Sequence, residues 1–276
     1  MNIILGFIVG SVGGIGLVFL FENLNPRLYT LDQIEAVTEL DVIGKIPLIK
    51  RNSLSGLRRN APIINSFAYR ESFHKLQTKI VQQSKNGHTT KSLLFTSAVP
   101  GEGKSTVVSN LGLAMGRAGQ KVIIVDCDMR RPTQHKFFGL PNKFGLSTLL
   151  NQQTMQIDVL QKSRNPKDPN TWVLTSGPLP PNPIELLGSA QMKSLIEQLV
   201  QKFDFVLLDA PAILPVGDAI VLSSMVDTIA LVTRQTYCKE EAVRDVCKQL
   251  ADTNTKMAGV IVNGAKQVGG NYYYKE

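Results

Sequence analysis

Ala98-Val99-Pro100-Gly101-Glu102-Gly103-Lys104-Ser105-Thr106 is the stretch that decides the fold of this 276-residue chain. An apolar segment typical of a buried strand, Leu93–Thr96, precedes it, and a segment typical of a helix, Thr106–Ala118, follows. A small residue, four variable residues and Gly-Lys-Ser between a strand and a helix form a P-loop. Its glycines let backbone N–H groups point at phosphate oxygens, and the helix N-terminus favours the same anion. The stretch therefore predicts a nucleotide-binding site.

The loop supplies most of the candidate ligand-binding residues. Lys104 has the length to reach the β- and γ-phosphates, and Ser105 offers a hydroxyl to Mg²⁺. The candidate nucleotide-binding residues of the loop are Pro100, Gly101, Glu102, Gly103, Lys104, Ser105 and Thr106.

Around the loop, short apolar segments alternate with helical ones. Helices are predicted at Thr106–Ala118, Met192–Lys202 and Glu240–Thr253. Because short apolar strands separated by helices favour a parallel sheet covered on both faces, the predicted fold class is α/β: a P-loop NTPase with a mostly parallel sheet, preceded by one transmembrane helix. The predicted strands are Leu93–Thr96, Val122–Asp126, Trp172–Leu174, Val206–Asp209, Thr228–Val232 and Gly259–Val262.

Two of these strands end on an aspartate. Asp209 closes Phe205–Asp209 in a Walker-B pattern, and Asp126 closes Val122–Asp126. Either aspartate alone is also compatible with a helix cap, but two of them after a P-loop point to magnesium and acceptor chemistry. Asp128 lies two residues beyond Asp126 and would face the same side of an extended strand end. Of this pair, one carboxylate can bind Mg²⁺ through water while the other accepts a proton. The candidate metal ligands are Ser105, Asp126 and Asp209, and the candidate catalytic residues are Lys104, Asp126, Asp128 and Asp209.

The N-terminal segment is apolar enough to cross a bilayer. The segment from Ile3 to Phe21 holds no charged residue and has about the 20 residues that a bilayer core requires. A cleavable signal peptide and a soluble hydrophobic helix are the alternatives, but Met1-Asn2 has no basic side chain and no cleavage site follows. The basic residues lie after this segment, so the positive-inside rule puts the C-terminal part in the cytoplasm. We expect residues 1–22 to be a single transmembrane helix of the bacterial inner (plasma) membrane.

Residues 23–65 have the character of a juxtamembrane linker, with a short helix at Leu31–Leu40 and a short strand that stops at Pro47. Residues 66–276 would then form the catalytic domain. Part of the net charge of +8 lies in the linker, where it suits an anionic membrane surface or a solvated segment. Nucleic acid is not expected as a partner because no basic motif interleaved with aromatics is present. The three cysteines have no metal-ligand spacing, and reduced thiols are expected.

Three motifs together resemble one family. They are the P-loop, Val125-Asp126-Cys127-Asp128-Met129-Arg130-Arg131-Pro132, and Leu207-Leu208-Asp209-Ala210-Pro211. In order and content they are similar to the Walker A, Walker A′ and Walker B motifs of the bacterial tyrosine kinases, the cytoplasmic domains of polysaccharide co-polymerases. The resemblance covers roughly residues 66–276.

The resemblance implies a membrane-anchored, ATP- and Mg²⁺-dependent protein-tyrosine autokinase that regulates capsular and exopolysaccharide synthesis and export. It implies that Lys104 and the loop amides hold phosphates, that Ser105 and Asp209 organise Mg²⁺, and that Asp126 and Asp128 align and deprotonate the tyrosine. It also points to Asn263 as an adenine contact. The implied phosphoacceptors are Tyr272, Tyr273 and Tyr274, which would enter the site of a neighbouring subunit in a homo-oligomer.

The chain departs from the family pattern in two places. The helix before the P-loop carries Glu71, His74 and Gln77 where the family has Glu-x-x-Arg-x-x-Arg, which weakens the expectation of a kinase ring. The first membrane helix and periplasmic domain of the family would belong to a separate co-polymerase partner or to a longer chain. Two alternatives stay open: a switch ATPase of the septum-placement and partition type, and a catalytically weak structural chain-length regulator.

Overall fold

The computed structural model describes residues 7, 10–14, 27–48, 67–85, 90–151, 160–163, 168 and 170–265. Most of the predicted transmembrane helix at 1–22 and all of the tyrosine tail at 272–274 lie outside the described residues. Within the described ranges, none of the helices combines the length and the hydropathy needed to cross a membrane.

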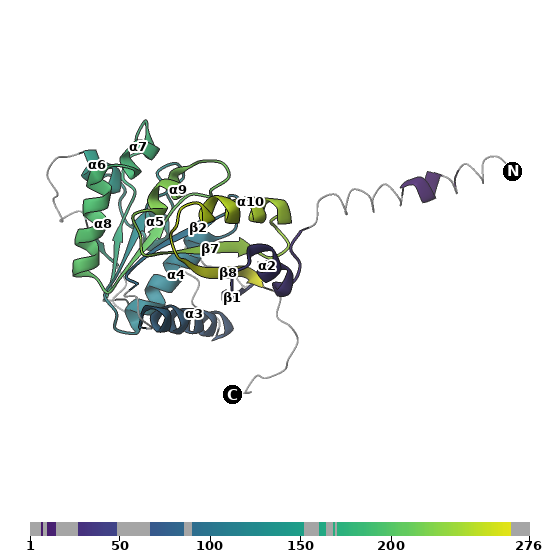
Figure 1. Ribbon diagram of the computed structural model, residues 1–276. Helices are drawn as coiled ribbons and strands as arrows, with labels where there is room; N and C mark the ends of the chain where they lie inside the picture. Colours follow the sequence, from purple (N-terminus) through teal and green to yellow (C-terminus); the bar gives the residue numbers. More distant parts are fainter. Residues whose placement is uncertain are drawn as a thin grey trace.

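The described strands form one eight-stranded sheet in the order β1-β8-β7-β2-β6-β3-β5-β4 (Figure 1). All neighbouring strands pair in parallel except β4 and β5, which are antiparallel. The predicted mostly parallel sheet is therefore confirmed. The strands are β1 (Val42–Pro47), β2 (Ser92–Ser97), β3 (Val122–Asp126), β4 (Gln161–Lys162), β5 (Thr171–Leu174), β6 (Phe205–Asp209), β7 (Thr228–Arg234) and β8 (Met257–Ala265).

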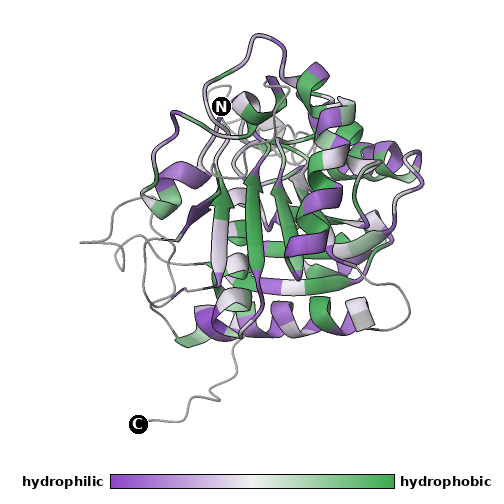
Figure 2. Cartoon of the chain, turned by 90° about the vertical axis from the view of Figure 1, so that its left-hand side faces the viewer, coloured by the Kyte–Doolittle hydropathy of each residue, from purple (hydrophilic) through white to green (hydrophobic). Residues whose placement is uncertain are grey.

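Helices cover both faces of this sheet. They are α2 (Leu31–Thr38), α3 (Phe67–Lys85), α4 (Lys104–Arg117), α5 (Gln134–Phe138), α6 (Leu146–Asn151), α7 (Pro183–Leu187), α8 (Ala190–Lys202), α9 (Asp218–Ser223) and α10 (Glu240–Ala251). The central strands are buried along their whole length and are predominantly hydrophobic, as Figure 2 shows. Continuous apolar runs of this kind are typical of strands enclosed by helices on both sides.

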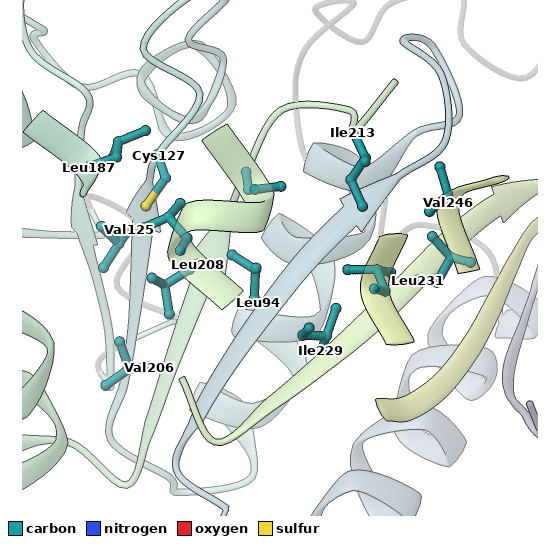
Figure 3. Packing of buried hydrophobic residues seen from close by; sticks show 14 of the residues in the cluster. Leu94, Val125, Cys127, Leu187, Val206, Leu208, Ile213, Ile229, Leu231 and Val246 are labelled. Atoms are coloured by element: carbon teal, nitrogen blue, oxygen red, sulfur yellow. The ribbon is translucent and has the colours of Figure 1, made fainter. Parts of the chain in front are cut away.

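Successive side chains of a strand serve two separate cores. Leu93 and Phe95 of β2 join the core under α3 and α4, whereas Leu94 joins the core under α8 and α10. Figure 3 shows Leu94 beside its register partners Leu208 of β6 and Ile229 of β7 in this second core. The predicted layers, with helices on both faces, are thus confirmed.

Close packing fixes the start of α4 relative to the sheet. A Cβ atom on Gly112 would lie 2.6 Å from Cδ1 and 2.9 Å from Cγ1 of Ile124 on β3, so any larger residue would have to displace Ile124 or the helix. Because α4 begins at Lys104, its contact with β3 brings the P-loop near the aspartate at the end of that strand.

Two elements of the predicted linker belong to the folded domain. β1 pairs in parallel with β8 at the edge of the sheet, and Ile34 and Val37 of α2 are buried in the core under α10. Thr30 and Gln33 form a capping box that starts α2. The folded domain therefore includes residues 27–48 as well as the described residues from 67 onward, because apolar side chains of β1 and α2 complete that edge of the sheet.

Candidate functional site

The P-loop connects β2, in the middle of the sheet, to α4. Gly101 and Gly103 have φ angles of +91° and +90°, a left-handed conformation that glycine adopts without a steric cost. Gly103 is the N-cap of α4 and has no side chain to occupy the first N–H groups of the helix. These donors and the helix dipole are what a phosphate group requires, as the sequence predicts.

The two strand-ending aspartates come together beside the loop. β3 and β6 are neighbours in register, and Asp126 is the direct partner of Asp209. Nζ of Lys104 lies 3.1 Å from Oδ2 of Asp128 and 3.4 Å from Oδ1 of Asp209. It also lies 3.2 Å from Oγ of Ser105. The structure thus gathers every predicted catalytic residue around one lysine.

Burial and charge set the electrostatics of this cluster. Burial, reinforced by the charge of Asp209, raises the pKa of Asp126 to about 8. Burial alone would lower the pKa of Lys104, but the carboxylates of Asp209 and Asp128 raise it. Three carboxyl groups surround one ammonium group, so ionisation of Asp126 leaves an excess of negative charge that favours an added cation.

One oxygen of Asp126 is available for such a cation. Its Oδ2 accepts hydrogen bonds from the backbone N–H groups of Thr133 and Gln134, at 3.0 and 2.9 Å. Its Oδ1 is buried and has no hydrogen-bond partner among the described residues. An unpaired buried carboxylate oxygen is costly unless a ligand satisfies it.

The donor set fits magnesium bound together with a nucleotide. Among the described residues, no three His, Cys, Asp or Glu side chains converge as a metal site. Mg²⁺ normally takes only one or two carboxylates and fills its remaining positions with phosphate oxygens and water. The hydroxyl of Ser105 and the carboxylates of Asp126 and Asp209 match this coordination preference, so these residues would hold the ion.

Gln134 is a site residue that the sequence analysis missed. Its side-chain Nε2 donates to Oδ2 of Asp209 at 2.7 Å and to the carbonyl of Ser105 at 3.2 Å. Its Oε1 accepts a hydrogen bond from the hydroxyl of Ser109 at 2.7 Å. Gln134 is fully buried and joins the P-loop helix to both strand-ending aspartates. Its position just after Arg131-Pro132 was the available signal.

Glu102 and Asn263, two residues predicted to contact the nucleotide, have side chains that contact other parts of the protein. The side chain of Glu102 is fully buried and contacts the end of β7. Nδ2 of Asn263 donates to the carbonyl of Glu102 at 2.8 Å, so this amide holds the loop from β8. A contact between Asn263 and adenine stays a prediction.

Arg130 is engaged in a paired contact within the protein. Its Nε and Nη2 atoms donate to the two oxygens of Asp218, at 2.8 and 3.0 Å. Asp218 is fully buried at the start of α9.

On α3, Glu71 forms an exposed ion pair with Lys75 at 3.7 Å.

A P-loop between a central parallel strand and a helix, faced by two strand-ending aspartates, defines the class of P-loop nucleotide-binding proteins. A family description named AAA domain matches residues 91–258. The chain belongs to the family of bacterial tyrosine-protein kinases, as the expected resemblance implied. It is 40% identical over 176 residues to tyrosine-protein kinase YwqD of Bacillus subtilis (strain 168), which covers 64% of this chain and 73% of that protein.

Two further relatives extend the match. Putative tyrosine-protein kinase CapB of Staphylococcus aureus is 36% identical over 189 residues, covering 67% of this chain and 82% of that protein. Tyrosine-protein kinase etk of Escherichia coli (strain K12) is 30% identical over 297 residues. That alignment covers 99% of this chain but only 40% of the longer protein.

Solved structures agree with this assignment. The kinase domain of Escherichia coli tyrosine kinase ETK superposes with a TM-score of 0.76 at 28% identity, over 88% of this chain and 97% of that one. The chimerical protein CapA2B2 gives 0.75 at 32% identity, over 86% and 100%. The cell division ATPase MinD of Pyrococcus furiosus gives only 0.53 at 25% identity, over 63% and 71%. The fold therefore resembles the kinase domains more than the septum-placement ATPase.

Proposed function

We propose that this chain is an ATP-dependent protein-tyrosine autokinase, anchored in the inner membrane by residues 1–22, that regulates capsular and exopolysaccharide synthesis and export. The observation that carries the proposal is the arrangement of Lys104 with Asp128 and Asp209 beside the P-loop, with a free oxygen of Asp126 next to them. Its relatives include proteins named tyrosine-protein kinases, which supports tyrosine as the residue that accepts the phosphoryl group.

Phosphoryl transfer requires positioning and charge neutralisation from the protein rather than a covalent intermediate. The loop N–H groups and Lys104 hold the phosphates of ATP. Ser105, Asp126 and Asp209 would hold Mg²⁺, which would neutralise charge on the phosphate oxygens. The tyrosine oxygen bonds to the γ-phosphorus as the bond to the β–γ bridging oxygen breaks, and ADP leaves. Asp126 and Asp128 align the tyrosine hydroxyl, and Asp128 takes its proton when Asp126 holds the ion.

The acceptors proposed are Tyr272, Tyr273 and Tyr274, entering the site of a neighbouring subunit in a homo-oligomer. The chain covers only part of the longer relative from Escherichia coli. A periplasmic co-polymerase part is therefore assigned to a separate partner or to a longer chain. The basic residues around 27–59 are proposed to lie against anionic headgroups.

The test is to incubate the full-length purified chain with Mg-ATP and to map phosphate by mass spectrometry. Phosphate on Tyr272, Tyr273 or Tyr274 that is lost in an Asp126→Asn variant supports the autokinase. ATP hydrolysis without phosphotyrosine would instead favour a switch ATPase. ATP binding without either reaction would favour a structural chain-length regulator. Membrane fractionation of the full chain and of a variant without residues 1–22 tests the anchor.

A further inference from the structure

Glu102 is a buried carboxylate in a place where phosphate binding does not need one. It lies between Gly101 and Gly103, the two loop glycines with positive φ, and its side chain is 0% exposed. A carboxylate would repel the phosphates of a nucleotide, so a role in contacting ATP does not explain it. Burying such a group is costly unless its oxygens are hydrogen-bonded.

The oxygens of Glu102 are extensively hydrogen-bonded. Oε2 accepts the N–H of Val99 at 2.9 Å, which closes the loop on itself. Oε1 accepts the hydroxyl of Thr233 and the N–H of Arg234, both at 3.1 Å, which ties the loop to the end of β7. The thiol of Cys238 also hydrogen-bonds to this carboxylate. Since each of these partners donates, the side chain acts purely as an acceptor.

Two further contacts hold the same segment from outside. The hydroxyl of Tyr237 donates to the carbonyl of Pro100 at 3.1 Å. Nδ2 of Asn263, at the end of β8, donates to the carbonyl of Glu102 at 2.8 Å. The P-loop is therefore fastened to the ends of β7 and β8 by Glu102, Thr233, Tyr237 and Asn263, which we call the loop clamp.

We propose that Glu102 is a positioning residue that sets the affinity for ATP by holding the P-loop in its phosphate-binding conformation before the nucleotide arrives. The proposal rests on the proposed function for the identity of the ligand. Glycine has the greatest backbone freedom, so a loop with glycines on both sides of Glu102 is costly to order. A loop that the clamp orders in advance avoids that cost at the moment of binding.

The test compares ATP affinity with loop protection in full-length protein. Glu102→Gln replaces one carboxylate oxygen by an amide nitrogen, which cannot accept the hydrogen bonds that this oxygen accepts in the wild type. We expect the Kd for Mg-ATP, by calorimetry, to rise about tenfold, the loss of one or two hydrogen bonds. Thr233→Val removes one donor and leaves the carboxylate in place, so a rise of about threefold is expected. This milder variant decides the matter if Glu102→Gln does not fold.

Asp227 provides a matched control at the opposite end of β2. Its Oδ2 also accepts three hydrogen bonds, from the N–H groups of Lys91 and Ser92 and the hydroxyl of Ser92, all at 2.8 Å. Asp227→Asn should lower thermal stability while leaving the Kd for ATP unchanged. If Glu102 had only a structural role, Glu102→Gln would likewise lower thermal stability without changing the Kd for ATP.

Hydrogen exchange in the nucleotide-free protein provides a readout independent of ATP. We expect faster exchange of the amides of residues 98, 99, 101–103 and 233–235 in Glu102→Gln and not in Asp227→Asn. A wild-type Kd in the Glu102 and Thr233 variants, or unchanged exchange in this loop, overturns the proposal. If wild-type protein does not bind ATP, the proposed function fails, and exchange alone still decides whether Glu102 orders the loop.

Discussion

Asp126 and Asp209 stand side by side as register partners at the carboxyl ends of β3 and β6. Burial, reinforced by repulsion between these two carboxylates, raises the pKa of Asp126 to about 8. In the absence of a cation, the folded protein therefore holds a proton that the unfolded chain releases near pH 3.8. Magnesium bound between phosphate and carboxylate would replace that proton.

The stability of the nucleotide-free, magnesium-free protein should fall as pH rises from 5 to 9. Because the folded-state pKa of Asp126 is raised, its contribution is fully present below about pH 4 and is lost as pH rises through about 8. Thermal unfolding in EDTA measures this slope. Asp126→Asn should have a shallower slope, and Mg-ATP should stabilise wild type most at high pH. Identical slopes for wild type and variant would contradict the assignment.

The sequence was sufficient to predict what is local. The P-loop, the strands that end on Asp126 and Asp209, and the longer helices each depend on a short continuous pattern. The short helices α5, α6, α7 and α9 were not predicted as helices, because five or six residues are too few to show helical periodicity. The two-residue strand β4 was missed for the same reason.

Contacts between distant segments could not be predicted in the same way. Gln134 reaches Asp209 across 75 positions, and Glu102 reaches Thr233 across 131. Neither distance leaves a periodic or spaced signal in one sequence. Glu102 is predicted to bind nucleotide because it lies inside the motif, and only its side-chain hydrogen bonds show that its carboxylate faces the protein.

Gln134→Leu should raise the magnesium concentration needed for half-maximal activity by about tenfold or more. Leucine has a similar volume but cannot donate to Asp209 or to the carbonyl of Ser105, and the partners that orient metal ligands typically contribute at this level. Gln83→Leu is the control, since Gln83 donates to the carbonyl of Ala258 on β8, outside the site. The measurement is phosphotyrosine formation against magnesium at saturating ATP. Equal magnesium dependence in both variants would remove Gln134 from the site.

Lys104→Met should reduce ATP-dependent tyrosine labelling by about 100-fold or more, the usual effect of removing one preorganised charge donor. Methionine fills similar space but cannot neutralise Asp128 or Asp209, so circular dichroism must accompany the assay. Lys193→Met, on an exposed position of α8, should label like wild type. Persistent labelling in folded Lys104→Met would exclude the proposed site.

Arg130→Leu should destabilise the protein by about 2 kcal/mol, because it leaves the buried carboxylate of Asp218 without its two hydrogen bonds, while the 40% exposure of Arg130 lets water reach this site and limits the loss. Asp218 is fully buried, and each of its two carboxylate oxygens accepts a hydrogen bond from Arg130. Arg244→Leu is the matched control: its 2.7 Å pair with Glu240 is half-exposed, and its loss should change stability by about 0.5 kcal/mol or less. Urea denaturation of both variants measures the difference. Asp218→Asn introduced into Arg130→Leu should restore part of the stability, because it removes the unpaired charge. Equal losses in the two arginine variants, or no recovery in the double variant, would show that the pair with the buried Asp218 contributes no more than a surface pair.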